Sequence, residues 1–380
     1  MSVIAAHLWD RLSETVDSGW CPGLVAGVRI NGQTEFFAAG SLGFEDPEPM
    51  VEDTPFRISS LSKLVGGALA LSKVADGTLA LDDGIGRWLP ALANPRVLVT
   101  PDAPLTLTVA ARGPVSVRHL LTFTAGLGIG LEPTPYVAAT QDFLWGPNPP
   151  NMAPEEYVAR LGSLPLAYQP GERWMYHSSA DVLSVLLAAA AVTPLDQLLQ
   201  ERISEPFGLT GTGFPTGAER FPVIYATNDD GGLFEALSYR DALAGPPKFA
   251  SLAGGLVSTV PDFVRFLAGL ADDAVLPAEL RHQMTADQLT SLQQIGVAEI
   301  AGPDDSWGFM TAVQTGKGQA WSEPGMWGWA GGSGTSAAVY PDGDIGVVFT
   351  QRFMNGAQGH FDFFWEPFGE LRANLRGLDA

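Results

Sequence analysis

Cysteine is nearly absent from this 380-residue chain, since Cys21 is the only one. A single thiol forms no intramolecular disulfide, and it excludes zinc sites built from several cysteines. Because Cys21 lies in the largely apolar residues 20–24, we interpret it as a small buried hydrophobic residue rather than a reactive thiol. Intramolecular disulfides are therefore excluded as a source of stability.

Positive charge is scarce as well. The chain has 21 lysines and arginines against 42 aspartates and glutamates, which leaves a net charge of −21. A field of that sign repels phosphate backbones and anionic lipid surfaces, so we expect neither a nucleic-acid partner nor a membrane partner. We interpret the acidic excess as a solubilising surface that carries no information about the reaction.

Long hydrophobic runs are also missing. The longest apolar run, residues 182–192, contains Ser184 and is too short to span a bilayer, so it predicts a buried helix. The first 20 residues have no basic start, and Asp10, Arg11 and Glu14 interrupt their apolar character, unlike a secretion signal. We therefore expect a soluble, cytoplasmic protein.

Several common motifs of hydrolases and of cofactor-binding or metal-binding proteins do not occur. There is no Gly-x-Ser-x-Gly elbow, no Gly-x-x-x-x-Gly-Lys-Ser/Thr phosphate loop and no His-Glu-x-x-His zinc motif. Residues 126–130 (GLGIG) lack the third glycine of a dinucleotide-binding turn, and the five histidines show no metal-ligand spacing. We therefore expect the protein to work without a cofactor or a metal.

The residues that are present predict strands near both ends of the chain. Asn31-Gly32 between two β-prone runs is a strong signal for a two-residue hairpin turn. A second hairpin is predicted over residues 335–350, with its turn at residues 341–343. The other predictions at the two ends are helices over residues 3–17 and 361–375 and a single strand over residues 307–313.

Helical patterns separated by Pro/Gly loops fill residues 85–300, and a further helix is predicted over residues 61–76. Gly66 and Gly67 inside that helix each cost about 1 kcal/mol of helix propensity, which indicates close packing against another element. The proline-rich residues 128–154 predict a long irregular loop. Its aromatic residues are candidates for a lid or pocket: Tyr136, Phe143 and Trp145.

The composition indicates a folded chain of two compact units. Hydrophobic residues make up 46% and charged residues only 17%, enough apolar surface for a sizeable core. With strands at both ends and helices between them, we predict that residues 1–84 and 305–380 form an α/β domain built from both termini. Residues 85–304 are predicted to form a mostly helical inserted domain.

Residues 60–63 form a Ser-x-x-Lys motif at the start of a predicted helix. Ser60 and Lys63 are one helical turn apart on one face, and the helix N-terminus favours negative charge developing on the serine oxygen. A lysine desolvated in a cleft loses its proton near neutral pH and acts as a base for the serine. The motif alone leaves a second interpretation open, an N-capping Ser60 beside a solvated Lys63.

The surroundings of the motif, residues 54–63 (TPFRISSLSK), resemble the serine β-lactamase/penicillin-binding-protein superfamily, and most closely its branch of class C-like, family VIII-type esterases. Blocks similar to that branch follow in order at residues 115–127 (VSVRHLLTFTAGL), 170–179 (PGERWMYHSS), 205–214 (EPFGLTGTGF), 253–262 (AGGLVSTVPD) and 328–335 (GWAGGSGT). The resemblance runs from about residue 21 to residue 352.

The resemblance implies a role for each matching residue. Ser60 is implied as the nucleophile that accepts the acyl group, Lys63 as the group that shares its proton, and Tyr176 as the relay to the leaving group. A phenol has an ordinary pKa of about 10, so we expect the Lys63 ammonium to stabilise a phenolate. Without the resemblance, Tyr176 would be interpreted as a core aromatic residue. The two backbone N–H groups of the oxyanion hole map to Ser60 and Gly332.

Three positions depart from the family pattern. Ser178 stands where the family usually has Asn and has less reach. Trp329 stands where β-lactamases and peptidases carry Lys or His, so it offers no positive charge to a substrate carboxylate, and it matches the Trp-x-Gly of some of the esterases. Phe123 replaces the usual His. We expect these three residues, with Gly331 and Trp327, to contact an apolar substrate.

The resemblance implies an α+β fold of the β-lactamase/transpeptidase type, in which helices flank an antiparallel sheet beside an all-helical domain. It implies a serine hydrolase that cleaves neutral, apolar carboxylic esters through a Ser60 acyl-enzyme, with Lys63 and Tyr176 as the acid–base pair. Three alternatives stay open: an acyltransferase, an amidohydrolase or weak β-lactamase that uses the same site, and a non-catalytic binding protein. The expected partner is a small apolar ester, and the sequence makes no prediction about the oligomeric state.

Overall fold

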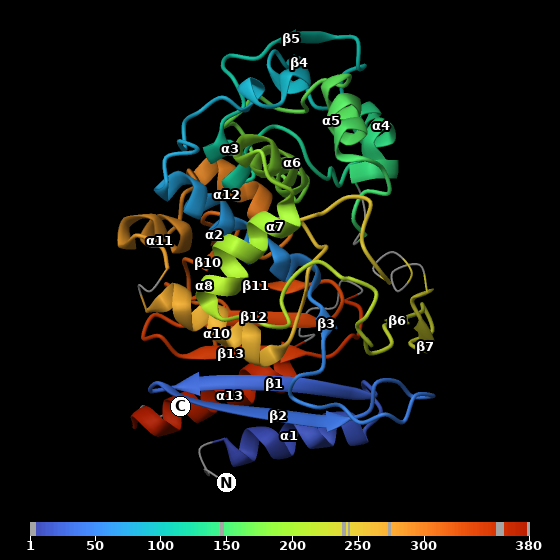
Figure 1. Cartoon of the computed structure of the whole chain (residues 1–380), viewed down its shortest axis with the longest axis vertical. Coiled ribbons are helices and arrows are strands. Elements are labelled where there is room, and N and C mark those ends of the chain that lie inside the picture. The colour runs from blue at the N-terminus through green and yellow to red at the C-terminus, as the bar shows by residue number, and fades with distance from the viewer. Residues whose placement is uncertain are drawn as a thin grey trace.

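The computed structural model describes residues 5–144, 148–237, 241, 244–272, 275–354 and 361–377. Its centre is a seven-stranded sheet in the order β2-β1-β13-β12-β11-β10-β9, in which every neighbouring pair is antiparallel. Its strands are β1 (Gly23–Ile30), β2 (Gln33–Gly40), β9 (Asp305–Trp307), β10 (Ala312–Gln314), β11 (Trp327–Gly331), β12 (Thr335–Val339) and β13 (Ile345–Phe349). The two ends of the chain meet in this sheet because β1 pairs with β13 (Figure 1).

Both predicted hairpins of the sheet are confirmed. Asn31 and Gly32, between β1 and β2, have φ angles of 51° and 77°, the left-handed values that a type I′ turn requires. The single strand predicted over residues 307–313 was wrong, because β9 and β10 are separate strands paired with each other. Met310 lies between them with a φ of 65°, and a left-handed residue does not continue an extended strand.

Helices cover both faces of the sheet (Figure 1). On one face, α1 (Ala6–Asp17) and α13 (Asp362–Arg376) contact each other, and both were predicted from the sequence. On the other face, α10 (Val260–Ala271) packs against β1 and β13. Gly27 in β1 permits this approach, since a Cβ there would lie 2.8 Å from Val260 Cγ1.

Most of the remaining helices fall within residues 85–304. They are α3 (Val117–Leu121), α4 (Pro135–Leu144), α5 (Pro154–Gly162), α6 (Ser179–Ala191), α7 (Leu195–Leu199), the π-helical turn η4 (Gln200–Ser204), α8 (Glu205–Phe207), α11 (Ala278–Thr285) and α12 (Ser291–Ala298), with 3₁₀ turns η2 (Ile85–Arg87) and η3 (Pro90–Leu92). Short antiparallel pairs join β3 (Phe56–Arg57) to β8 (Val257–Ser258), β4 (Arg96–Leu98) to β5 (Thr108–Ala110) and β6 (Tyr225–Thr227) to β7 (Leu233–Glu235). Because α10 belongs to this segment and yet covers the sheet, the division into two units stays a prediction.

The helix predicted over residues 61–76 is confirmed as α2 (Ser62–Ala75), which runs through the interior of the molecule. Gly66 and Gly67 are points of close approach, as predicted. A Cβ on Gly66 would lie 3.0 Å from Leu252 Cβ, and a Cβ on Gly67 would lie 2.8 Å from Phe309 O. Larger residues at these two positions would therefore push α2 away from its neighbours.

The long irregular loop predicted over residues 128–154 was wrong in part, because α4 lies within it. Pro135 opens that helix, where a missing N–H costs no hydrogen bond, so this proline starts a helix rather than preventing one. Tyr136 and Phe143 are buried within α4, and Trp145 lies outside the described residues.

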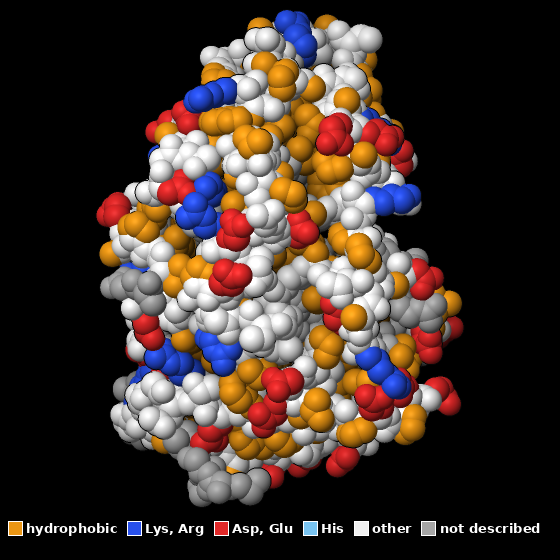
Figure 2. Space-filling view, viewed as in Figure 1, with side chains coloured by type: hydrophobic (Ala, Val, Ile, Leu, Met, Phe, Trp, Pro, Cys, Tyr) orange, Lys and Arg blue, Asp and Glu red, His pale blue; other side chains and the backbone are white. Residues whose placement is uncertain are grey.

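The surface is acidic, and the described helices are short. Figure 2 shows acidic side chains spread over the visible face among fewer basic ones, in keeping with the net charge of −21. Among the described helices, no single one is long and apolar enough to cross a membrane; α6 and the run that follows it meet the same criterion only as a pair bent by 87°.

Candidate active site

The turn that carries Ser60 is fastened to the loop between β11 and β12. Ser59 precedes Ser60 in the 3₁₀ turn η1 (Ser59–Leu61) and has a φ of 47°. Its Oγ donates a hydrogen bond to Ser333 Oγ at 2.9 Å, and Ser333 Oγ donates to Arg57 O at 2.7 Å. These bonds hold the serine-bearing turn against the end of the sheet.

Gly331, the last residue of β11, allows this close approach. A Cβ on Gly331 would overlap Ile58 O and Thr335 Oγ1, and Thr335 Oγ1 already donates to Ile58 O at 3.0 Å. The next residue, Gly332, borders the same cavity as Ser60. The two backbone N–H groups predicted for an oxyanion hole therefore belong to residues on opposite sides of one tightly packed junction.

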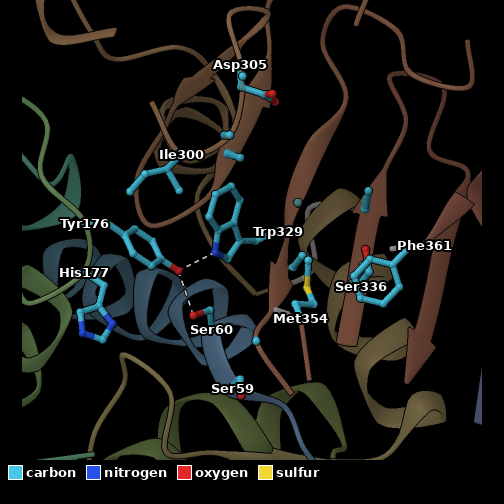
Figure 3. A pocket seen from close by; sticks show the side chains of 18 of the residues that line it. Ser59, Ser60, Tyr176, His177, Ile300, Asp305, Trp329, Ser336, Met354 and Phe361 are labelled. Atoms are coloured by element: carbon cyan, nitrogen blue, oxygen red, sulfur yellow. Dashed lines mark hydrogen bonds between the residues drawn. The ribbon is translucent and has the colours of Figure 1, made fainter. Parts of the chain in front are cut away.

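Ser60 Oγ accepts hydrogen bonds from two other predicted residues. Lys63 Nζ donates to it at 2.9 Å. Tyr176 OH donates to it at 2.8 Å (Figure 3). Lys63 comes from the first turn of α2, whereas Tyr176 comes from the segment that leads into α6. The structure thus brings the serine, the lysine and the tyrosine within hydrogen-bonding distance of one another through the serine oxygen.

Burial sets the protonation of Lys63. Its side chain is fully buried, and Nζ also donates to Ala253 O at 2.5 Å. Burial lowers the pKa of Lys63 to about 7, and the attraction of the Asp181 carboxylate partly opposes that fall. Near neutral pH, a substantial share of Lys63 is therefore an uncharged amine able to take a proton from Ser60.

Tyr176 is held on both sides of its hydroxyl. While OH donates to Ser60, it accepts a hydrogen bond from Trp329 Nε1 at 2.7 Å (Figure 3). Burial raises the pKa of Tyr176 to about 12, and the bonds with Ser60 and Trp329 only reduce that rise. Although Lys63 Nζ lies 4.7 Å from the centre of the tyrosine ring, the phenol stays neutral, so the structure favours lysine rather than phenolate as the base.

The site opens into a cavity of about 800 Å³. Five of the predicted site residues line it: Ser60, Tyr176, Trp327, Trp329 and Gly332. Further lining residues that the sequence did not single out include Ile129, Ile300, Phe353, Met354, Phe361 and Trp365. The walls are therefore largely apolar and aromatic.

The charged groups of the cavity are acidic. Four of its lining residues are aspartates: Asp181, Asp304, Asp305 and Asp362. Apart from Lys63, whose Nζ reaches Ser60, no Lys or Arg is among the described residues that line it.

Three predicted substrate contacts are not cavity-lining residues. Ser178 is fully buried just before α6, so its hydroxyl group does not face the cavity. Phe123 is also fully buried, and its ring packs against Tyr176 from behind, with ring centres 5.8 Å apart. Gly331 packs against the turn that carries Ser60. These residues support the wall rather than form it.

The other aromatic candidates likewise belong to the core. Tyr136 OH accepts a hydrogen bond from Gly128 N at 3.1 Å, and the ring of Phe143 packs edge-on against Tyr157. His177 lines the cavity beside Tyr176, where burial lowers its pKa to about 3 and keeps its ring neutral. In the described part of the chain, no group of three His, Cys, Asp or Glu side chains is placed to hold a metal ion.

Asp181 and Ser251 are the site residues that sequence reasoning missed. Asp181 lies in the first turn of α6, and its Oδ1 accepts a hydrogen bond from Ser251 Oγ at 2.6 Å. The available signal was an ionisable side chain inside an otherwise apolar helical run. Ser251 had no such signal, because its role depends on a loop that only the fold brings to α2.

A Ser-x-x-Lys motif whose serine also binds a tyrosine beside a cavity defines the class of this protein, a serine hydrolase. The family model described as Beta-lactamase matches residues 8–364, and the chain belongs to that family. The fold expected from the sequence is confirmed by solved structures. The hydrolase EstCE1, described as having promiscuous acyltransferase activity, matches with a TM-score of 0.80 at 24% identity over 97% of this chain and 98% of that one.

Other relatives fall in the same group. The simvastatin synthase LovD from Aspergillus terreus matches with a TM-score of 0.81 at 21% identity, over 98% of this chain and 99% of its own. Esterase EstB from Burkholderia gladioli is 30% identical over 82% of this chain and 81% of its own length. An uncharacterised Mycobacterium tuberculosis protein is 31% identical, over 89% and 87% respectively. The family therefore includes esterase and acyltransferase relatives of this chain.

Proposed function

We propose that the protein is a carboxylesterase that works through an acyl-enzyme on Ser60. The observation that carries this proposal is the pair of hydrogen bonds on Ser60 Oγ, from a buried lysine with a pKa of about 7 and from a neutral tyrosine. This arrangement argues against the two alternative interpretations, in which Lys63 is a solvated surface charge and Tyr176 a core aromatic residue. In neither case would both side chains be expected to bind one serine oxygen that borders a cavity.

In the acylation step, Ser60 Oγ attacks the ester carbonyl carbon and its proton passes to the neutral Lys63 amine. The oxyanion that forms is stabilised by the backbone N–H groups of Ser60 and Gly332. When the intermediate collapses, the bond from carbon to the alcohol oxygen breaks. The proton then reaches the leaving alkoxide through Tyr176 OH, which is reprotonated from Lys63.

Deacylation repeats these steps with water. The attacking water passes a proton by way of Tyr176 OH to the neutral Lys63 amine, and the oxyanion forms again. The bond from carbon to Ser60 Oγ then breaks, Lys63 returns the proton to Ser60 Oγ, and the acid is released. No other group has to enter the proton balance. The aromatic walls and the lack of an added cation support neutral, apolar esters as the substrates.

Labelling with an activated phosphonate tests this proposal. We expect one phosphonyl group per chain, located by peptide mass spectrometry on Ser60, with parallel loss of p-nitrophenyl butyrate hydrolysis. S60A is expected to take up no label. A label on another serine, or full esterase activity in S60A, would overturn the proposal.

A second candidate is acyl transfer to an alcohol. It is favoured by one observation, that relatives of this chain include the monacolin J acid methylbutanoyltransferase of Aspergillus terreus, 33% identical over 44% of this chain. Both reactions share the acyl-enzyme and differ in the acceptor. Product analysis with p-nitrophenyl butyrate and added 1-butanol separates them: an esterase yields mainly butyrate, whereas a transferase yields mainly butyl butyrate.

A further inference from the structure

A buried chain of groups links Lys63 to a carboxylate on another helix. Lys63 Nζ donates to Ala253 O at 2.5 Å, and Ala253 N donates to Ser251 Oγ at 3.1 Å. Ser251 Oγ in turn donates to Asp181 Oδ1 at 2.6 Å. The loop from Ser251 to Ala253 thus spans from α2 to the first turn of α6.

This loop is fixed at its centre as well as at its ends. Leu252 N donates to Ser184 Oγ of α6 at 2.9 Å, and Leu252 packs against Gly66 of α2. Ser251 and Leu252 are essentially inaccessible to solvent, and Ala253 is 3% exposed. A change at the α6 end therefore reaches the carbonyl that Lys63 touches.

The other titratable groups around this chain are neutral. Near Lys63, Tyr176 keeps its proton because burial raises its pKa to about 12, and His177 is uncharged because burial lowers its pKa to about 3. Near Asp181, burial raises the pKa of Tyr157 well above its ordinary value. Asp181 itself is 3% exposed, and its attraction opposes the loss of the Lys63 proton.

We propose that Asp181 is a positioning residue for Lys63, which acts through Ser251 and the Ala253 carbonyl to hold the lysine against Ser60 and to stabilise the ammonium formed in acylation. The inference rests on the proposed function. It adds to that function a residue that does not contact the ester bond being cleaved. The proton leaves Ser60 Oγ and resides on Lys63 Nζ. Burial raises the pKa of Asp181 to about 6, so its carboxyl group is ionised at the neutral and basic pH values at which Lys63 acts as a base. A buried ammonium without a counter-charge would be costly to form.

The test is the pH dependence of kcat/KM for p-nitrophenyl butyrate in D181N. Asparagine still accepts the Ser251 hydrogen bond but carries no charge. Without the carboxylate, Lys63 holds its proton less tightly, so the acidic limb of the profile moves to lower pH. Because the amine is also a weaker base, the plateau falls about tenfold or more. D181E retains the charge and is expected to return the limb toward its wild-type position.

Asp262 provides the matched control. It is also 3% exposed and lies in the first turn of a helix, α10, where it accepts hydrogen bonds from Gly211 N and Thr212 Oγ1 away from the cavity. D262N is expected to lower the melting temperature and leave the pH profile in place. An equal shift of the profile in D262N, or an unchanged profile in folded D181N, would overturn the proposal.

If D181N melts below the assay temperature, S251A gives the answer instead. It retains the carboxylate but removes its link to the Ala253 loop, so the rate of phosphonate labelling is expected to fall about fivefold or more; an unchanged rate contradicts the inference. Labelling of wild type separates the two proposals. A wild type that takes no label on Ser60 refutes the esterase proposal, whereas labelled wild type with unaffected D181N refutes only the role of Asp181.

Discussion

The hydrogen bond from Trp329 to Tyr176 gives the most specific prediction. W329F removes the indole N–H that donates to Tyr176 OH at 2.7 Å and keeps an aromatic ring on the cavity wall. The phenol then loses a bond that lowers its pKa, so it becomes a poorer proton donor to the leaving group. A hydrogen bond of this kind contributes about 1 kcal/mol net, which corresponds to about a fivefold change in rate.

The assay compares two esters of the same acid. p-Nitrophenolate leaves without protonation, whereas ethoxide needs a proton, so W329F is expected to reduce kcat/KM about fivefold more for ethyl butyrate than for p-nitrophenyl butyrate. W327F is the matched control, since Trp327 lines the same cavity two residues earlier on β11. Equal losses on both esters, or the same selectivity in W327F, would refute the assigned role of Trp329.

The protonation of Lys63, the packing of Gly331 and the burial of Ser178 can each be tested. Since Lys63 acts as a base only when deprotonated and burial lowers its pKa to about 7, kcat/KM is expected to decrease as pH falls through about 7; a pH profile that stays flat down to 5 contradicts this. G331A places a methyl group against Ile58 O and Thr335 Oγ1, so it is expected to destabilise the fold by about 1–3 kcal/mol in urea unfolding and to lower activity, unlike G113A, where a Cβ would meet no atom within 4 Å. S178A is expected to leave KM unchanged, because Ser178 is buried and does not line the cavity. A severalfold rise in KM would show that Ser178 contacts the substrate after all.

The parts of the fold that follow from local rules were predictable from the sequence. Asn31-Gly32 has a backbone preference that fixes its turn whatever surrounds it. Gly66 and Gly67 lower the helix propensity of α2, so close packing was expected there. The structure shows this packing against Leu252 and Phe309. In contrast, β9 and β10 are three residues each, too short for an alternating pattern to separate them.

The candidate site divides in the same way. Ser60 and Lys63 are three residues apart, so helix geometry alone places them together. Tyr176 entered only through a family resemblance, because nothing local indicates that its hydroxyl reaches Ser60. The roles of Trp329 and Asp181 depend on contacts between distant segments, and Phe123 was misplaced because an apolar residue looks the same in a core and on a pocket wall.

The central claim is that Ser60 carries the acyl group, and a pre-steady-state measurement tests it most directly. Wild type and S60A are mixed with p-nitrophenyl butyrate, and p-nitrophenol release is followed from the first milliseconds. The account predicts a burst near one equivalent in wild type and none in S60A, with intact-mass detection of a butyryl group on the wild-type chain. Steady turnover in S60A at the wild-type rate, without a burst in either protein, would contradict it.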